Sequence, residues 1–366
     1  MRPISQTDDG KNNFDAIRLA MALAVVWSHS FALALPEGER AEPVSRITNG
    51  HYSAGSIAVM VFFTISGYLI CQSWMSSRDL RSFLEKRVRR IYPGYMAATS
   101  ICAFVVVPAF STVYDLSPYT IAKTISSNLL LRNFFPPSTA FAHNLNTAVN
   151  GSLWSIPFEF WCYIFTAALG LLGLLRSARA VIAIIAVTLL ARAAFDLFDR
   201  KPGWGAIGYI FGWPYLWTFV LPCFLSGALV FLLKDRIPRH LAILVALVTA
   251  FFAACYAPLG AKFQQIASQL IFPAAVAYST FYLAFSDRIR LRNAACYGDL
   301  SYGTYLYAFP IQQALISANL FSLPEVVLLS AALSILAGAL SWHLVEKHFL
   351  SRSKLARRQL HPAITT

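Results

Sequence analysis

Two ionisable side chains lie in the first long apolar stretch of the sequence. Arg18 is near its start, and His29 follows eleven residues later. In an α-helix, eleven steps of 100° turn through about 1100°, which places both side chains within about 20° of one another on one face. The same steps rise roughly 16 Å, about half the hydrocarbon thickness of a bilayer. The spacing therefore predicts a cation near a membrane surface and an imidazole deep inside.

A carboxylate is predicted at a similar depth. Glu159 lies in an apolar segment that begins near residue 152, roughly 12 Å below the outer surface, while His29 lies roughly 9 Å below it. A carboxylate that binds one ring nitrogen raises the basicity of the other, which suits a general base for a hydroxyl group. We predict His29 and Glu159 as catalytic residues. The alternatives are a histidine bonded to a neighbouring helix and a glutamate held by backbone or tyrosine groups.

A basic run precedes residue 91, and it includes Arg87 and Arg90. These two arginines are one helical turn apart and can form a two-armed clamp for a phosphate group. A basic run at a membrane edge otherwise sets topology or binds anionic lipid headgroups.

Three further polar residues lie in apolar segments. Ser66 is next to Gly67, and small residues of this kind allow close helix packing, which leaves Ser66 a weak candidate nucleophile. Tyr302 and Tyr305 open an aromatic segment that is typical of a membrane interface, and their hydroxyl groups can also line a polar cleft.

The composition predicts an all-α polytopic membrane protein. Of 366 residues, 57% are hydrophobic and 13% are charged, with a mean hydropathy of +0.56. A soluble domain carries roughly twice that charged fraction. A window of about 19 residues gives about ten candidate spans. They lie near 14–35, 55–74, 91–110, 152–175, 179–197, 207–233, 239–257, 264–285, 300–321 and 324–345.

The net charge of +13 follows the positive-inside rule. With both termini in the cytoplasm, most Lys and Arg residues fall in the cytoplasmic tails and loops, so the charge requires no nucleic acid. The outer loops are expected to keep Arg40, Arg46, Lys123, Arg132, Arg192, Arg200, Lys201 and Lys262. Between the third and fourth spans, residues 121–135 are predicted as an interfacial or re-entrant segment. The six cysteines lie singly in apolar segments and are predicted as small hydrophobic residues, with no metal site.

Motifs spread along the chain follow a recognisable order. They are Arg18 with His29, Phe63–Ile70, Arg87–Arg90 with Tyr92 and Pro93, Leu153–Ser155 with Glu159, Ser301 and Tyr302 with Tyr305 and Leu306, and Val345–Lys347. Together they resemble the acyltransferase-3 family of integral membrane proteins over residues 13–350. We expect a transmembrane acyltransferase domain over residues 1–350 and a short basic cytoplasmic tail over 351–366.

The resemblance implies an activity. Members of this family O-acylate, and mostly O-acetylate, carbohydrates such as O-antigen, exopolysaccharide and lipo-oligosaccharide. It therefore implies acetyl-CoA as co-substrate on the cytoplasmic side, a carbohydrate acceptor on the other side, and a location among the lipids of a bacterial inner membrane, without a metal or nucleic acid. The residues expected to bind the donor are Arg18, Arg87, Arg90, Ser66, Tyr302 and Tyr305.

The sequence departs from the family in two places. Many relatives have His-Trp-Pro where this chain has Ala308, Phe309 and Pro310, so no catalytic role rests on that position. We also expect no appended SGNH-type hydrolase domain, which in some relatives takes part in the transfer. We therefore expect direct transfer or a separate partner protein.

Two mechanisms and two rival functions follow. His29, oriented by Glu159, either deprotonates the acceptor hydroxyl or accepts the acyl group itself. The rival from another class is a secondary transporter or lipid-linked glycan flippase in which His29 and Glu159 relay protons. Inverted repeats with paired broken helices would accompany such a transporter, and the sequence has none. A membrane scaffold without chemistry is the third interpretation.

Overall fold

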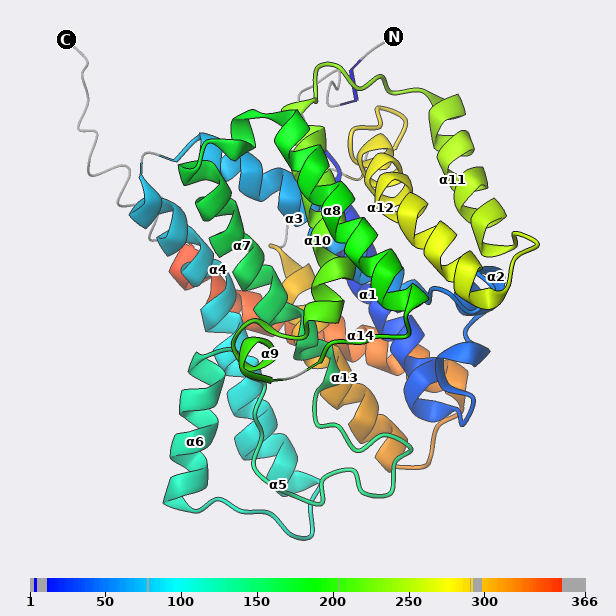
Figure 1. Ribbon diagram of the computed structural model, residues 1–366. Coiled ribbons are helices and arrows are strands. Elements are labelled where there is room, and N and C mark those ends of the chain that lie inside the picture. The colour runs from blue at the N-terminus through cyan, green and yellow to red at the C-terminus, as the bar shows by residue number, and fades with distance from the viewer. Residues whose placement is uncertain are drawn as a thin grey trace, which may run out of the picture. The chain divides into compact units, whose positions relative to one another are not determined.

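The structure is a computed structural model of helices, with no strand among the residues that it describes (Figure 1). These residues are 3–4, 12–77, 79–203, 205–289, 291 and 298–350, and the side chains of residues 206, 207 and 209 are also left undescribed. The predicted tail over residues 351–366 lies outside the described residues, as does Cys296.

The chain divides into two compact units. Unit 1 comprises residues 1–28, 39–77 and 157–294, and unit 2 comprises residues 29–38, 78–156 and 295–366. Helices α1 (Phe14–Ala34) and α7 (Ser155–Leu171) each run from one unit into the other.

Unit 1 is built around the contact between two long apolar helices, α3 (Ala54–Met75) and α10 (Pro214–Leu232). Helices α8 (Ala178–Leu197) and α12 (Ala261–Ala284) also pack on α10, and α11 (Leu241–Cys255) packs on α12 (Figure 1). The short helices α2 (Pro43–Ile47) and α9 (Gly205–Phe211) complete the unit.

Paired glycines set the distance between α3 and α10. A Cβ atom at Gly67 would overlap the carbonyl oxygen of Phe224, and a Cβ atom at Gly227 would overlap that of Thr64. The helices therefore approach until backbone meets backbone, as small residues permit in membrane proteins. The packing role predicted for Gly67 is confirmed.

Asn13 fixes the start of α1 within unit 1. Its side-chain amide donates to the carbonyl oxygens of Leu283 at 3.2 Å and Ile289 at 2.7 Å, and its carbonyl accepts from the amide nitrogen of Leu291 at 3.1 Å. These bonds join the first turn of α1 to the end of α12 and the loop after it. Arg18 lies just over one turn into α1. The bonds of Asn13 therefore fix the position of Arg18 relative to the end of α12.

Unit 2 contains α4 (Leu80–Ile101), which continues through a π-helical turn (Cys102–Val106) into α5 (Val107–Ala109). Helix α6 (Pro118–Leu129) packs on α4, and a 3₁₀ turn, η3 (Gly151–Trp154), precedes α7. Helix α13 (Leu300–Ser317) lies along α14 (Leu323–Ser341) and also contacts α4 and η3. A second π-helical turn, η5 (Trp342–Glu346), ends α14.

The predicted all-α class is confirmed, and every predicted span overlaps at least one helix. Seven of the described helices are long and apolar enough to cross a membrane. Helices α7, α11 and α13 do not meet these limits, so ten crossings remain a prediction. The seven segments are Phe14–Ala34, Ala54–Met75, Leu80–Ala109, Ala178–Leu197, Pro214–Leu232, Ala261–Ala284 and Leu323–Leu350.

Two predicted boundaries were wrong. The third helix begins at Leu80 rather than near residue 91, because Asp79 caps it, and the basic run therefore lies inside α4. The predicted span over 207–233 is two helices, because Gly212 adopts φ of +85° and Pro214 starts a new helix. The segment predicted as interfacial or re-entrant overlaps the C-terminal part of α6.

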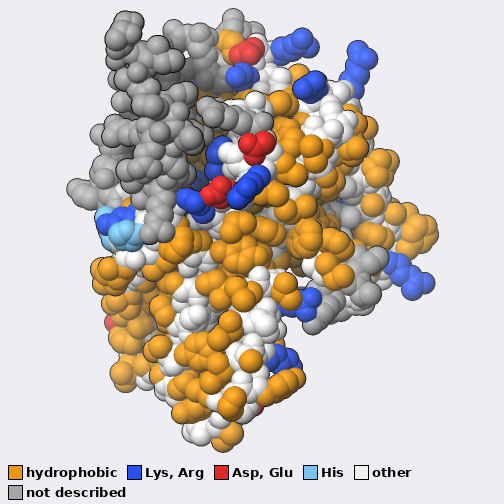
Figure 2. Space-filling view, turned by 90° about the vertical axis from the view of Figure 1, so that its left-hand side faces the viewer, with side chains coloured by type: hydrophobic (Ala, Val, Ile, Leu, Met, Phe, Trp, Pro, Cys, Tyr) orange, Lys and Arg blue, Asp and Glu red, His pale blue; other side chains and the backbone are white. Residues whose placement is uncertain are grey.

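Large apolar side chains are exposed on the outer helices. They include Val187 and Leu190 on α8 and Leu328, Leu336 and Leu340 on α14. Hydrophobic side chains also cover much of the face in Figure 2. Exposed apolar area of this extent is suited to lipid rather than water, so the helices form an integral membrane protein.

The glycine contact leads to a stability prediction. Gly227→Ala is expected to lower the free energy of unfolding by about 1–3 kcal/mol, because the new Cβ atom meets a backbone carbonyl that no side-chain rotation can move. Gly203→Ala is the control, since its nearest neighbours would lie at 3.8 and 3.9 Å. Thermal unfolding of the detergent-purified protein measures both variants. Equal unfolding midpoints for the two would contradict the close α3–α10 contact.

Candidate active site

His29 lies half-buried on α1, in unit 2. Its Nδ1 atom is 3.5 Å from the hydroxyl oxygen of Ser152 in η3. Its ring meets that of Phe309 on α13 edge to face, with centroids 5.5 Å apart and planes at 81°. The imidazole is therefore placed by one hydroxyl group and one aromatic ring.

The η3 turn that carries Ser152 is fastened to α13. The Asn150 side chain accepts from the Ser152 amide nitrogen at 3.2 Å and donates to the Leu306 carbonyl at 2.9 Å. A Cβ atom at Gly151 would lie 2.6 Å from the Phe309 ring, so only glycine fits between them. The turn is thus held against the ring that contacts His29.

Tyr305 adds a second attachment between α13 and η3. Its hydroxyl group donates to the Ser152 carbonyl at 2.5 Å and lies 2.7 Å from the Ser155 hydroxyl. Since the single phenolic proton goes to the carbonyl, Ser155 donates to Tyr305. Tyr305, which we predicted in the donor site, therefore supports the turn beside His29.

Gln312 fixes α1 one residue beyond His29. Its side-chain amide donates to the Ser30 hydroxyl at 2.7 Å, and both residues are fully buried. Sequence reasoning missed Asn150, Ser152 and Gln312. The signal available was their polarity inside or beside apolar segments, where polar groups need partners.

Arg90 lies at the centre of an ionic cluster in unit 2. Its Nη2 atom is 2.5 Å from Asp299, and its Nη1 atom is 3.9 Å from Glu346, which is 2% exposed. Its guanidinium group lies 5.3 Å from the centroid of the Tyr302 ring. Two carboxylates offset the charge of Arg90, and neither was among the predicted site residues.

Tyr302 and Arg87 lie beside this cluster. The Tyr302 hydroxyl donates to the Ile91 carbonyl at 2.9 Å, which ties α13 to α4. The Arg87 guanidinium lies 5.8 Å from the centroid of the Phe83 ring. Arg87 and Arg90 share α4 one turn apart, as predicted from their spacing, and their joint binding of phosphate stays a prediction.

Helix α13 connects the two groups of residues. Tyr302 contacts Arg90 and the α4 backbone, while Phe309, seven residues later, contacts His29. Seven residues rise roughly 10 Å in an α-helix. Helix α13 therefore contacts the ionic cluster around Arg90 and the imidazole of His29 at two points that are roughly 10 Å apart along its axis.

Glu159 is bound by hydroxyl groups of unit 1. One of its carboxylate oxygens accepts from the Tyr163 hydroxyl at 2.5 Å and lies 3.5 Å from the Ser66 hydroxyl. A tyrosine therefore binds this glutamate, as one of the predicted alternatives described. Tyr163, one turn further along α7, was missed, although its spacing from Glu159 permitted the contact.

Three predicted site residues, Arg18, Ser66 and Glu159, belong to unit 1. His29 belongs to unit 2, so its pairing with Glu159 stays a prediction. Arg18 is half-buried on α1.

The described cysteine side chains lie in the protein interior. The five cysteines within the described ranges are buried free thiols, in keeping with small hydrophobic residues. The same ranges contain no group of three or more His, Cys, Asp or Glu side chains that could hold a metal ion.

The fold and the site define a polytopic helical membrane protein with a half-buried imidazole and an ionic cluster around Arg90. The sequence profile of the family described as Acyltransferase domain matches residues 11–343, and the chain belongs to this acyltransferase-3 family. The chain is 32% identical to an O-acetyl transferase of Shigella phage Sf6, over 93% of this chain and 97% of that protein. It is 25% identical to nodulation protein 10 of Rhizobium leguminosarum bv. viciae, over 99% and 100%. No solved structure matches it significantly.

These comparisons confirm the resemblance stated above. The protein is an enzyme, an acyltransferase of the O-acetyltransferase type.

The support that Tyr305 gives to η3 leads to a second prediction. Tyr305→Phe removes the hydroxyl group that bonds Ser152 and Ser155, and kcat for acetyl transfer is expected to fall about tenfold, the equivalent of about 1.4 kcal/mol. Tyr307→Phe, which removes another buried hydroxyl group from α13, is the control. Transfer rates in isolated membranes measure the effect, and a wild-type rate for Tyr305→Phe would show that the bond to η3 has no part in catalysis.

Proposed function

We propose that this protein transfers an acetyl group from cytoplasmic acetyl-CoA to a hydroxyl group of a carbohydrate on the other side of a bacterial inner membrane. The acceptor classes that the family resemblance implies are exopolysaccharide, O-antigen and lipo-oligosaccharide. The printed name of the Shigella phage relative, O-acetyl transferase, supports the acetyl group.

The observation that carries the proposal is the arrangement along α13. A coenzyme A thioester has its phosphates at one end and its acyl group at the other. Unit 2 likewise has arginines near Tyr302 and an imidazole near Phe309, separated by roughly 10 Å of helix. A donor whose phosphates lie near Arg87 would then direct its thioester toward His29.

His29 acts as the general base in this proposal. In this proposal Nδ1 carries the proton and donates it to the Ser152 hydroxyl group, which leaves Nε2 as the basic nitrogen. Nε2 takes the proton of the acceptor hydroxyl group, whose oxygen bonds to the acyl carbon as the carbon–sulfur bond breaks. His29 then returns the proton to the leaving sulfur. Glu159 is proposed to raise the basicity of His29.

The arginines bind the phosphates of the donor. The guanidinium group of Arg90 has five N–H donors, so it can bind a phosphate while it contacts Asp299 and Glu346. Arg87 supplies the second arm of the clamp and Arg18 a further positive charge. Tyr302 holds the Arg90 side chain in place, and Ser66 is retained as a proposed donor contact.

The role of His29 leads to the third prediction. His29→Ala is expected to abolish carbohydrate acetylation at an unchanged level of membrane expression, because no base remains at this position. Mass spectrometry of the cell's glycans, with and without the gene, detects the added acetyl mass and identifies the acceptor. His143→Ala, at an exposed loop residue, is the control. Acetylation retained by His29→Ala would exclude His29 as the base.

The same variant separates the two mechanisms. Incubation with labelled acetyl-CoA in the absence of acceptor is expected to leave the protein unlabelled. Label that remains bound to wild type but not to His29→Ala would show instead that His29 accepts the acyl group.

The arginine clamp leads to the fourth prediction. Arg87→Gln is expected to raise the Kd for acetyl-CoA about tenfold, since one charged phosphate contact contributes about 1.4 kcal/mol. Arg89→Gln, on the same helix, removes a cation that pairs with Glu85 at 2.5 Å and serves as the control. Titration of the purified variants with acetyl-CoA gives both values. Equal Kd values for Arg87→Gln and wild type would contradict the clamp.

A further inference from the structure

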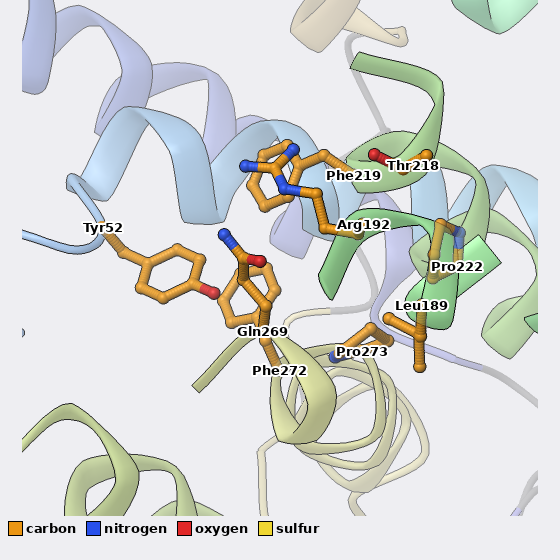
Figure 3. Close-up of a pocket in the computed structure, with 9 residues that line it drawn as sticks. All are labelled: Tyr52, Leu189, Arg192, Thr218, Phe219, Pro222, Gln269, Phe272 and Pro273. Carbon is orange, nitrogen blue, oxygen red and sulfur yellow. The ribbon is translucent and has the colours of Figure 1, made fainter. Parts of the chain in front are cut away.

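A second polar site lies in unit 1, between α8, α10, α12 and the residues that lead into α3. Figure 3 shows this pocket, with Tyr52, Arg192 and Gln269 directed toward it among aromatic rings. Its empty volume is about 220 Å³, smaller than pockets that enclose drug-sized ligands. The space within it that a water-sized group can reach is about the size of one water molecule. It therefore fits a water molecule or one small substituent of a larger molecule.

Arg192 supplies the charge of this pocket. The prediction that it lies in an outer loop was wrong, because it belongs to α8 and is 8% exposed. Its Nε atom bonds Asp196 at 3.0 Å, one turn further along the helix, and the Tyr215 hydroxyl donates to the same carboxylate at 2.6 Å. The Arg192 guanidinium also lies 3.9 Å from the centroid of the Tyr215 ring. The pair is thus neutral overall and well bonded, as burial requires.

Two other polar atoms of the pocket make no hydrogen bond of normal geometry within the described residues. They are the buried Tyr52 hydroxyl group and the buried Gln269 Oε1 atom. The Ser268 side chain lies beside the Tyr52 hydroxyl group. The Tyr52 and Gln269 side chains are 4% and 8% exposed. A buried polar atom without a partner costs about 1–3 kcal/mol, so such atoms are uncommon. A hydroxyl group in the pocket, from a water molecule or from a ligand, would complete the hydrogen bonds of both atoms.

The chemistry of the lining selects the class of ligand. Gln269 Oε1 only accepts a hydrogen bond, whereas the Tyr52 hydroxyl both donates and accepts. A single hydroxyl group satisfies both atoms at once, because it can donate to Gln269 Oε1 and accept from the Tyr52 hydroxyl group. Asp196 already compensates the charge of Arg192, which removes the attraction for an anion. The lining therefore favours a neutral, hydroxyl-bearing group.

We propose that this pocket binds one hydroxyl-bearing group of the acceptor carbohydrate and so contributes to acceptor specificity. The inference rests on the proposed function for the class of ligand, but it concerns binding and not transfer. Tyr52 and Gln269 are the proposed specificity residues. Arg192 lines the same pocket, and its side chain is held in place by Asp196.

The test measures binding by the purified full-length protein in nanodiscs. The probes are the methyl glycosides of glucose, galactose, mannose and rhamnose, with inorganic phosphate as the anionic probe, each followed by saturation-transfer NMR. At least one glycoside is expected to bind wild type. Gln269→Leu is expected to weaken that binding about fivefold, the effect of one lost hydrogen bond. Gln264→Leu is the matched control, because Gln264 lies on the same helix and bonds Asn49 instead.

Tyr52→Phe is expected to weaken binding by a similar factor. Because it removes a single oxygen atom and keeps the ring, it tests the pocket even if Gln269→Leu fails to fold. The proposal is overturned if no glycoside binds, if both pocket variants bind like wild type, or if phosphate binds with the same sensitivity to Gln269→Leu. Glycoside binding is measured without acetyl-CoA, so a failure of the proposed transfer chemistry and a failure of this site give different results.

Discussion

The contact between α13 and α14 determines the arrangement of unit 2. A Cβ atom at Gly303 would lie 2.7 Å from the Cα atom of Gly338, and one at Gly338 would lie 2.7 Å from the Thr304 amide nitrogen. Glycine at both positions lets the backbones touch, and dispersion contacts rather than the hydrophobic effect hold such helices together in lipid. This contact fixes α13 along α14, and every residue that binds His29 or Arg90 from α13 depends on it.

Polar groups in these apolar helices find partners by two routes. Arg192 is compensated by Asp196 on its own helix, which needs only helical spacing. Arg90 is compensated by Asp299 and Glu346, which are more than two hundred residues away in the chain. The second route joins α4, α13 and the end of α14, so the ionic cluster holds unit 2 together.

Rigid support of the imidazole distinguishes the His29 site from an isolated buried histidine. Ser152 contacts the ring, and η3, which carries Ser152, is attached to α13 through Asn150 and Tyr305. The Phe309 ring packs edge to face against the imidazole and completes this support from α13.

The sequence alone determined the helices and the spacing of residues within each of them. Apolar segments predict helices because hydropathy and helical periodicity are local, and for the same reason Arg87 and Arg90 share one turn of α4. The i, i+4 spacing of Arg192 and Asp196 was equally local, and it was overlooked. Only tertiary structure brought Ser152 to His29 and Asp299 to Arg90, because more than a hundred residues separate the partners. Such contacts depend on which helix faces pack together, and local composition does not encode that choice.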